Sequence, residues 1–243
     1  GELDQQGMVC DFGTVKKVLR NWMDDEIDHR LLVPELAEGL TITQSAGRIE
    51  LRCDTARGPI TMNAPREAVT LIDAKEITIQ SVASWCIRQL ESHFPNSIDQ
   101  LSLDFTPEEI NGAMYHYSHG LKKHDGNCQR IAHGHRSRIQ IWLNGDRDAD
   151  EEAHWAKCWE DIYIGSQEDL ISSDNGIYQF EYTAQQGKFS LSLAQRHCYL
   201  MNTDTTVELI ASHLANQIKA RHPKNSVTVR AFEGVNKGAM VSL

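Results

Sequence analysis

Apolar residues recur at helical spacing in several stretches of the chain. In residues 81–94 and 208–222 they stand three or four positions apart, which predicts two amphipathic helices, each covering one face of a sheet. Residues 11–27 carry a similar stripe and predict a third helix, with a counterpart in residues 148–164. The stripe residues are Val82, Trp85, Cys86, Leu90 and Phe94 in the first helix, Ile210, Leu214 and Ile218 in the second, and Val15, Val18, Leu19 and Trp22 in the third.

Other segments alternate apolar and polar residues with a period of two. Residues 47–54, 177–184 and 225–233 follow this pattern, which is typical of half-buried antiparallel strands. Strands and amphipathic helices together predict an α+β protein, in which helices pack on one side of an antiparallel sheet.

The chain contains an internal repeat. Residues 58–98 have a counterpart in residues 187–227, and both copies run strand, turn, strand, helix. After each helix we expect another strand, followed by Gly-Ala-Met at 112–114 and at 238–240. The repeat predicts two related units in tandem, residues 1–112 and residues 113–243.

Composition narrows the possible partners. The chain has 24 basic and 34 acidic residues, and its sequence pI is near 5.5. This balance argues against a broad nucleic-acid or anionic-membrane surface, but a few local cations would suffice for a phosphorylated small molecule. Six cysteines are spread singly, without a C-x-x-C pair, which favours reduced thiols in a soluble, cytoplasmic protein.

Histidines are concentrated in one region. Five of the eleven lie between residues 116 and 135, and His133 and His135 share one face of a predicted strand, separated by Gly134. A hairpin through residues 120–132 would bring His119 beside them. Three imidazoles without a fourth protein ligand are typical of a catalytic zinc site, although a His-x-His pair also occurs on surface strands without any metal.

Cys128 lies five residues before His133. No second cysteine accompanies it, so it is a poor candidate for a zinc ligand. Near a dication and near Lys122, Lys123 and Arg130, its pKa would be lowered, which suits a base or nucleophile. The alternative is an ordinary buried thiol.

These residues resemble the signature of the 6-pyruvoyltetrahydropterin synthase and 6-carboxytetrahydropterin synthase family. The resemblance rests on Tyr115 four residues before His119, and on Cys128 followed by His133-Gly134-His135. It extends to the opening Gly-Met-Val-Cys-Asp-Phe at 7–12, the pair Asp28-His29, the segment Thr205-Thr206-Val207-Glu208, and Glu233 on the last predicted strand.

The resemblance implies two tandem tunnelling-fold units and a homo-oligomer that binds neither nucleic acid nor membrane. It further implies zinc on His119, His133 and His135, proton transfer by Cys128 with Asp28 and His29, and pterin binding by Glu233, Thr206 and Glu208. The Asp28-His29 pair could instead cap a helix, and Glu233 could be a solvated residue.

The implied activity is that of a zinc-dependent lyase. Its substrate would be 7,8-dihydroneopterin triphosphate and its product 6-carboxy-5,6,7,8-tetrahydropterin, as in queuosine-type deazapurine synthesis. The 6-pyruvoyl product is the alternative. A catalytically inactive pterin-binding protein is the alternative of another class, and a structural zinc protein is the least favoured.

The two predicted units differ. The first reads Thr78-Ile79-Gln80 where the second has Thr-x-Glu, it has Asp104 where the second has Glu233, and its zinc hairpin would precede Gly1. The second has no Asp-His pair after its first helix. We therefore expect Asp28 and His29 of one unit to complete the site of the other. We also expect an extra hairpin within residues 30–77.

Overall fold

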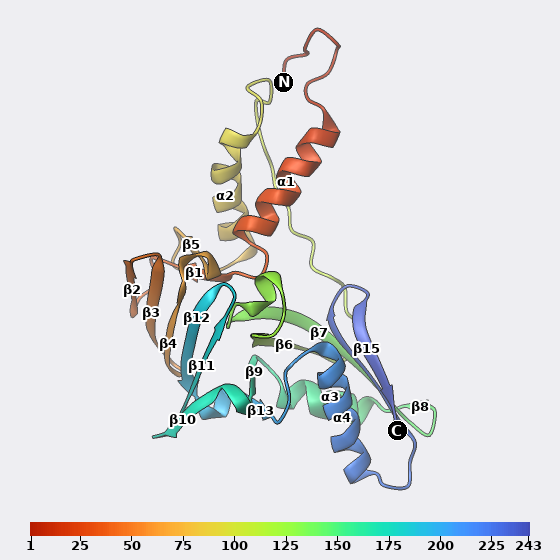
Figure 1. Ribbon diagram of the computed structural model, residues 1–243. Helices are drawn as coiled ribbons and strands as arrows, with labels where there is room; N and C mark the ends of the chain where they lie inside the picture. The colour runs from red at the N-terminus through yellow and green to blue at the C-terminus, as the bar shows by residue number, and fades with distance from the viewer.

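A computed structural model describes residues 1–243 as an α+β protein with two main sheets (Figure 1). The first sheet has six antiparallel strands in the order β10-β11-β12-β4-β3-β2. Its strands are β2 (Leu40–Ser45), β3 (Arg48–Thr55), β4 (Gly58–Pro65), β10 (Leu170–Asp174), β11 (Ile177–Ala184) and β12 (Gly187–Ala194). The extra hairpin predicted in the first half is present as β2 and β3.

The second sheet runs in the order β13-β9-β6-β7-β14-β15, and the short β8 pairs with β7. Its strands are β6 (Met114–His119), β7 (His133–Leu143), β8 (Asp146–Arg147), β9 (Ile162–Ser166), β13 (Cys198–Met201), β14 (Val227–Gly234) and β15 (Lys237–Ser242). Helices α3 (Ala149–Cys158) and α4 (Val207–Arg221) cover one face of this sheet (Figure 1).

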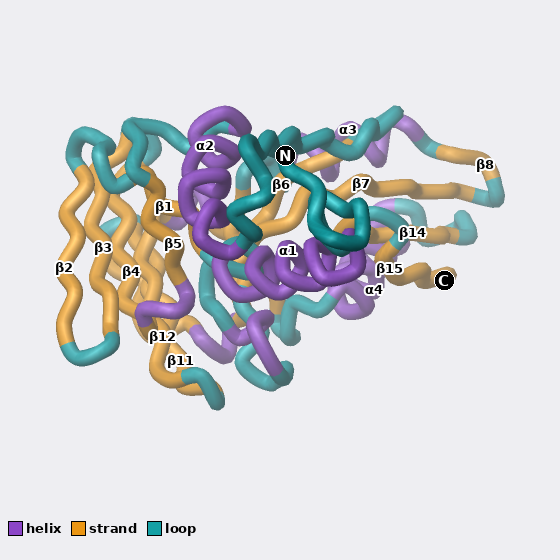
Figure 2. The backbone as a smooth tube through the Cα atoms, turned by 90° about the horizontal axis from the view of Figure 1, so that it is seen from above, coloured by secondary structure: helices purple, strands orange, loops and turns teal.

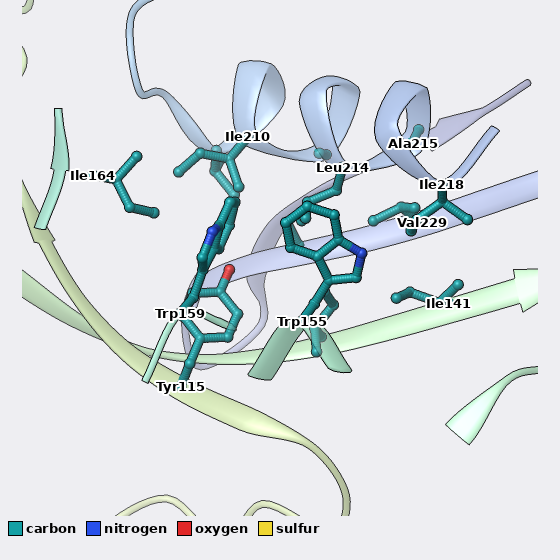
Figure 3. Packing of buried hydrophobic residues seen from close by; sticks show 14 of the residues in the cluster. Tyr115, Ile141, Trp155, Trp159, Ile164, Ile210, Leu214, Ala215, Ile218 and Val229 are labelled. Carbon is teal, nitrogen blue, oxygen red and sulfur yellow. The ribbon is translucent and has the colours of Figure 1, made fainter. Parts of the chain in front are cut away.

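The largest apolar core lies between this sheet and the two helices. It contains eighteen buried residues, and Figure 3 shows Trp155 and Trp159 beside Tyr115, beneath Ile210 and Leu214 of α4. Trp159 meets Tyr115 edge to face, with ring centroids 5.3 Å apart. This core fixes the strands that carry the histidines.

Side-chain caps set the beginnings of all four helices. In α1 (Phe12–Glu26) the carboxylate of Asp11 accepts from the Thr14 amide, and in α2 (Ile79–Leu90) Thr78 and Ser81 form a capping box. Asp148 and Thr206 cap α3 and α4 in the same way. The predicted helices at 11–27, 81–94 and 208–222 are confirmed, with boundaries shifted by a few residues. The helix predicted at 148–164 is confirmed only as far as Cys158, because residues 162–164 belong to β9.

Helices α1 and α2 project away from both sheets, as Figures 1 and 2 show. They pack on each other through Trp22, Val82, Cys86 and Leu90. Beneath them, β1 (Leu31–Pro34) pairs in parallel with β5 (Val69–Ile72) in a separate two-stranded sheet. The turn that follows α1 therefore lies next to the second sheet, at the ends of β6 and β7 that carry the histidines.

Two fold predictions are wrong. The sheets are not wholly antiparallel, because β9 pairs in parallel with both β13 and β6, and β1 pairs in parallel with β5. Residues 98–111 form no strand after α2, although Leu101, Leu103 and Phe105 pack alternately against the cluster between α1 and α2. A strand needs a hydrogen-bonding neighbour, and this segment has none. Asp104 is exposed within it.

The two halves of the chain have matching elements and meet edge to edge. Strands β4 and β12 pair antiparallel at the centre of the six-stranded sheet, with Met62 opposite Leu191. These residues stand at the same position of the sequence repeat, counted from Gly58 and Gly187. A second apolar core of thirteen buried residues, including Met62 and Leu191, lies on this sheet.

No helix of the structure combines the length and the apolar character needed to cross a membrane.

Candidate active site

The pairing of β6 with β7 brings the three histidines together. His119 is directly opposite His133, and Tyr117 is directly opposite His135. The imidazoles share the face that carries the buried Tyr115 and Tyr117, and His119 and His133 are only 1% and 2% exposed. The predicted return of His119 to the His-Gly-His pair is therefore observed.

Backbone carbonyls fix the orientation of each ring. The Nδ1 atoms of His119, His133 and His135 lie 3.0, 2.9 and 2.8 Å from the carbonyl oxygens of Thr205, Arg130 and Glu233, respectively. A carbonyl only accepts hydrogen bonds, so Nδ1 carries the proton and Nε2 presents a lone pair. The hydrogen positions are assigned from these partners.

The three Nε2 atoms converge. Those of His119 and His135 are 3.2 Å apart, and that of His133 is buried without a hydrogen-bond partner. Two lone pairs at that distance repel, and a cation between them would remove the repulsion. One ligand atom from each histidine lies within 4.8 Å of the others. The donor set therefore fits a metal ion with an open position.

Burial keeps these imidazoles neutral. Loss of solvation lowers the pKa of His133 to about 3, and it lowers the pKa of His119 well below the ordinary value. The pKa of His135 is also lowered, chiefly by burial. Only a neutral imidazole can bind a metal, so the pocket holds the ligands in the required protonation state.

Cys128 lies beside this cluster and contacts the first half of the chain. It belongs to a short 3₁₀ turn, Gly126–Gln129, and its Sγ is 3.4 Å from Nε2 of His29. On the other side of that ring, Nδ1 is 2.5 Å from Oδ2 of Asp28. The structure thus aligns a carboxylate, an imidazole and a thiol in one row.

His29 reaches this position through the turn that follows α1. Its backbone has φ 55°, a left-handed conformation that is uncommon for residues other than glycine. Asp161, between α3 and β9 in the second half, has the matching φ of 52°. The second half thus has an aspartate where the first half has His29.

The prediction that neighbouring cations lower the pKa of Cys128 is wrong for the protein without metal. Burial raises this pKa, and the carboxylates of Glu233 and Asp28 raise it further. Lys122 instead pairs with Asp169 at 2.6 Å and Lys123 with Asp204 at 3.0 Å. Arg130 is directed away, toward Gln186 and the Asp28 carbonyl.

The predicted pterin-binding residues occupy two places. Glu233 is half-buried on β14, and its carbonyl oxygen accepts the hydrogen bond from His135. Thr206 caps α4, and the exposed Glu208 lies in the first turn of that helix. The residue of this segment that contacts the histidines is Thr205, which sequence analysis did not single out.

A cavity of about 250 Å³ opens beside the histidines. Its wall includes Asp28, His29, Arg30, Gly134 and His135. A larger cavity of about 620 Å³ lies on the opposite side of β6, where His116 and Ser118 point away from the three histidines. The smaller cavity is the one in contact with the candidate chemistry.

Two arginines near this cavity have few anionic partners. Arg130 is 6% exposed, and no carboxylate lies within ion-pair distance of it. Burial lowers its pKa, and the nearby charge of Arg30 lowers it further. Arg30 pairs with Glu26 at 3.4 Å. The carboxylates of Glu67, Asp28 and Glu26 raise the pKa of Arg130 from beyond ion-pair distance, so acidic groups lie nearby although none forms an ion pair with it.

Arg136 and Arg138 of β7 are both half-buried. Arg138 forms an ion pair with Glu108 at 3.4 Å and stacks over the ring of Phe232. Arg136 donates to the Glu108 carbonyl oxygen. Both arginines hold the segment that connects the two halves.

A glutamine outside the predicted site residues supports the Cys128 turn. Gln186 lies between β11 and β12. Its backbone N–H donates to the side-chain oxygen of Gln129, and its side-chain Nε2 donates to Asn127 at 2.9 Å. Its Oε1 accepts from Arg130 at 3.3 Å. Three hydrogen bonds from one residue restrict the movement of the turn.

Comparison with solved structures gives low similarity. A catalytic-residue variant of Plasmodium vivax 6-pyruvoyltetrahydropterin synthase shares 16% identity, with 54% of this chain and 91% of that chain covered and a TM-score of 0.41. For the Plasmodium falciparum 6-pyruvoyl tetrahydropterin synthase, the identity is 10%, the coverage is 54% and 91%, and the TM-score is 0.40.

No curated protein matches the chain. The family model described as 6-pyruvoyl tetrahydropterin synthase matches residues 1–110, the part that contains Asp28 and His29. Residues 1–110, a little under half of the chain, are therefore similar to the 6-pyruvoyl tetrahydropterin synthase family.

Proposed function

We propose that the protein is a zinc-dependent lyase that converts 7,8-dihydroneopterin triphosphate to 6-carboxy-5,6,7,8-tetrahydropterin. One observation carries the proposal: the Cys128 thiol lies 3.4 Å from His29 Nε2, beside three imidazoles whose free nitrogens converge. The similarity of residues 1–110 to the 6-pyruvoyl tetrahydropterin synthase family model supports the assignment to pterin chemistry.

His119, His133 and His135 would hold the zinc ion. When bound, the ion supplies Lewis-acid polarisation of substrate oxygens and acidifies the neighbouring protons. The carbonyls of Thr205, Arg130 and Glu233 keep the three rings in the ligating orientation.

Cys128 and His29 would move protons at the substrate. His29 Nε2 is placed to accept the thiol proton at 3.4 Å, and Asp28 at 2.5 Å from Nδ1 stabilises the imidazolium that then forms. Burial raises the pKa of Cys128, and the carboxylates of Glu233 and Asp28 raise it further. The thiol is therefore a proton donor at rest and becomes a base only after His29 has accepted its proton.

Glu233 would hold the pterin. A carboxylate can accept two parallel hydrogen bonds from the ring N–H and the exocyclic amine of a pterin. Arg130, which forms no ion pair, and the nearby Arg30 would meet the triphosphate end of the same substrate. Substrate binding by Thr206 and Glu208 stays a prediction.

We further propose that residues 1–112 and 113–243 are tandem tunnelling-fold units that share this site. Matching elements, the pairing of Met62 with Leu191, and the matching turns at His29 and Asp161 support a duplication. Asp28 and His29 come from the first unit, and Cys128 with the three histidines comes from the second. The site would depend on both units.

The 6-pyruvoyl product is the alternative outcome of the same residues, and a pterin-binding protein without catalysis is the alternative of another class. Incubation of zinc-loaded protein with 7,8-dihydroneopterin triphosphate separates these functions. Product mass spectrometry distinguishes carboxy from pyruvoyl, and acetaldehyde release accompanies only the carboxy product. Binding of the substrate without any product would contradict the proposed lyase.

Replacement of His29 by alanine tests the shared site. We expect His29→Ala to lose at least 100-fold in kcat, the usual contribution of a positioned acid or base, with zinc content unchanged at one ion per chain. Replacement of the exposed His93 by alanine is the matched control and should leave both values unchanged. Full activity of His29→Ala would exclude a site shared between the units.

A further inference from the structure

The candidate site contains a second group of metal-ligand atoms. Besides His119, His133 and His135, the ligand atoms of His29, Cys128 and His133 lie within 4.8 Å of one another. Two ligands of one tetrahedral zinc ion stand about 3.5 Å apart when one is a sulfur and the other a nitrogen. The Cys128 Sγ to His29 Nε2 distance of 3.4 Å matches that separation.

The two imidazoles of this group are oriented as ligands. Asp28 accepts from Nδ1 of His29, and the Arg130 carbonyl accepts from Nδ1 of His133, so both rings direct the lone pair of Nε2 inward. A carboxylate or carbonyl behind the imidazole is the usual outer contact of a metal-bound histidine. The side chain of His29 is 25% exposed, which gives an ion a path from solvent.

We propose that His29, Cys128 and His133 form an alternative metal site that selects soft, thiophilic cations, and that its occupation blocks the reaction proposed above. The last part rests on the proposed function, whereas the binding itself does not.

The two metal positions exclude each other. His133 has one free nitrogen, because its Nδ1 is occupied by the Arg130 carbonyl. A cation that is bound by both Nε2 of His133 and Cys128 therefore leaves only His119 and His135 as ligands for the other position. The pair of sites is a choice between two positions and not a two-metal centre.

The chemistry of the ligands decides which of the two positions a given metal ion prefers. Three imidazoles suit zinc, whereas a thiolate strengthens binding of softer ions. Binding replaces the S–H bond of Cys128 by a sulfur–metal bond and releases the proton to solvent. The bound ion would occupy both the thiol and Nε2 of His29, and no group would remain at this place for proton transfer.

Titration of the zinc-loaded protein with Cd²⁺ tests the proposal. We expect an ultraviolet sulfur-to-cadmium charge-transfer band that saturates at one Cd²⁺ per chain, together with release of one zinc ion. Cys128→Ser should lose the band, and His29→Ala should weaken Cd²⁺ binding at least tenfold. In the metal-free protein, where no zinc competes, His119→Ala should keep both the band and the Cd²⁺ affinity, because His119 does not belong to this group.

Cys158 provides the control for other thiols. It is exposed and lies 3.7 Å from His154 Nε2, so it is a surface cysteine–histidine pair without a third ligand. Cys158→Ser should keep the band of the unmodified protein. If the band survives in Cys128→Ser, or if Cd²⁺ replaces zinc without any band, the alternative site does not exist.

The optical readout is independent of turnover. If no pterin is converted but the charge-transfer band depends on Cys128 and His29, the alternative metal site is supported and the proposed function fails. If turnover is found and persists at saturating Cd²⁺ with the band present, the proposed block of the reaction is wrong.

Discussion

At the scale of single residues, each histidine of the site has one ring nitrogen, Nδ1, held by a hydrogen bond, and its other ring nitrogen, Nε2, is directed toward the site. Each of the three clustered histidines donates a hydrogen bond from Nδ1 to a backbone carbonyl, and His29 donates one from Nδ1 to Asp28. Two of these partners, Thr205 and Glu233, are remote in the sequence from the histidines that they orient. The His-Gly-His spacing predicted the pair on β7, but nothing in it indicated Thr205 or Arg130 as the partners.

The lowered pKa values predict an acid-sensitive fold. In the unfolded chain a histidine binds a proton below about pH 6.5, whereas His133 in the fold resists protonation down to about pH 3. The unfolded state then binds more protons, so the free energy of unfolding falls as the pH drops through 6.5 toward 3. The contribution is fully present above pH 6.5.

Urea unfolding of the metal-free protein between pH 8 and pH 4 measures this dependence. His133→Gln should flatten the curve, although it also lowers stability overall. Replacement of exposed His93 by glutamine should leave the curve unchanged. An equally steep curve in His133→Gln would show that other groups cause the acid sensitivity.

At the scale of elements, the turn between β11 and β12 positions the Cys128 turn. Because Gln186 makes three of the contacts that restrain residues 127–130, Gln186→Ala should lower kcat about 10-fold to 100-fold while zinc content stays the same. Replacement of Gln195, which has a single side-chain contact to Ser173, is the matched control and should change kcat little. Equal kcat values for the two variants would contradict the positioning role.

Sequence patterns predicted which helices and strands form better than they predicted which of these elements lie side by side. The helices followed from apolar periodicity and caps, which are local signals. The strand expected near Leu101, Leu103 and Phe105 alternates correctly, yet no strand lies beside it. The parallel pairing of β9 with β6 and β13 depends on how segments come together in space, so alternation alone did not reveal it. For the same reason, sequence patterns did not indicate that Gln186 and Thr205 contact the site.

At the scale of the whole molecule, the six-stranded sheet joins the halves through β4 and β12. Met62 is 1% exposed and Leu191 is 5% exposed, and both belong to one core. Truncation of a buried methionine to alanine costs about 2–5 kcal/mol of unfolding free energy. We expect Met62→Ala to fall in this range when measured by urea unfolding.

Ile60, on the same strand but 39% exposed, is the control for this prediction. Ile60→Ala should cost less than Met62→Ala, because less apolar area leaves contact with the core. Equal losses would mean that the centre of the sheet is not tightly packed. A single unfolding transition in both variants would indicate that the two halves unfold together.

The register between β4 and β12 has a consequence for assembly. A strand that meets its repeat counterpart at the same residue has the geometry with which two identical strands pair about a two-fold axis. The internal junction therefore has the form of an isologous dimer contact. If the chain were cut between the halves, each fragment would carry an edge complementary to its former neighbour and also to its own copy.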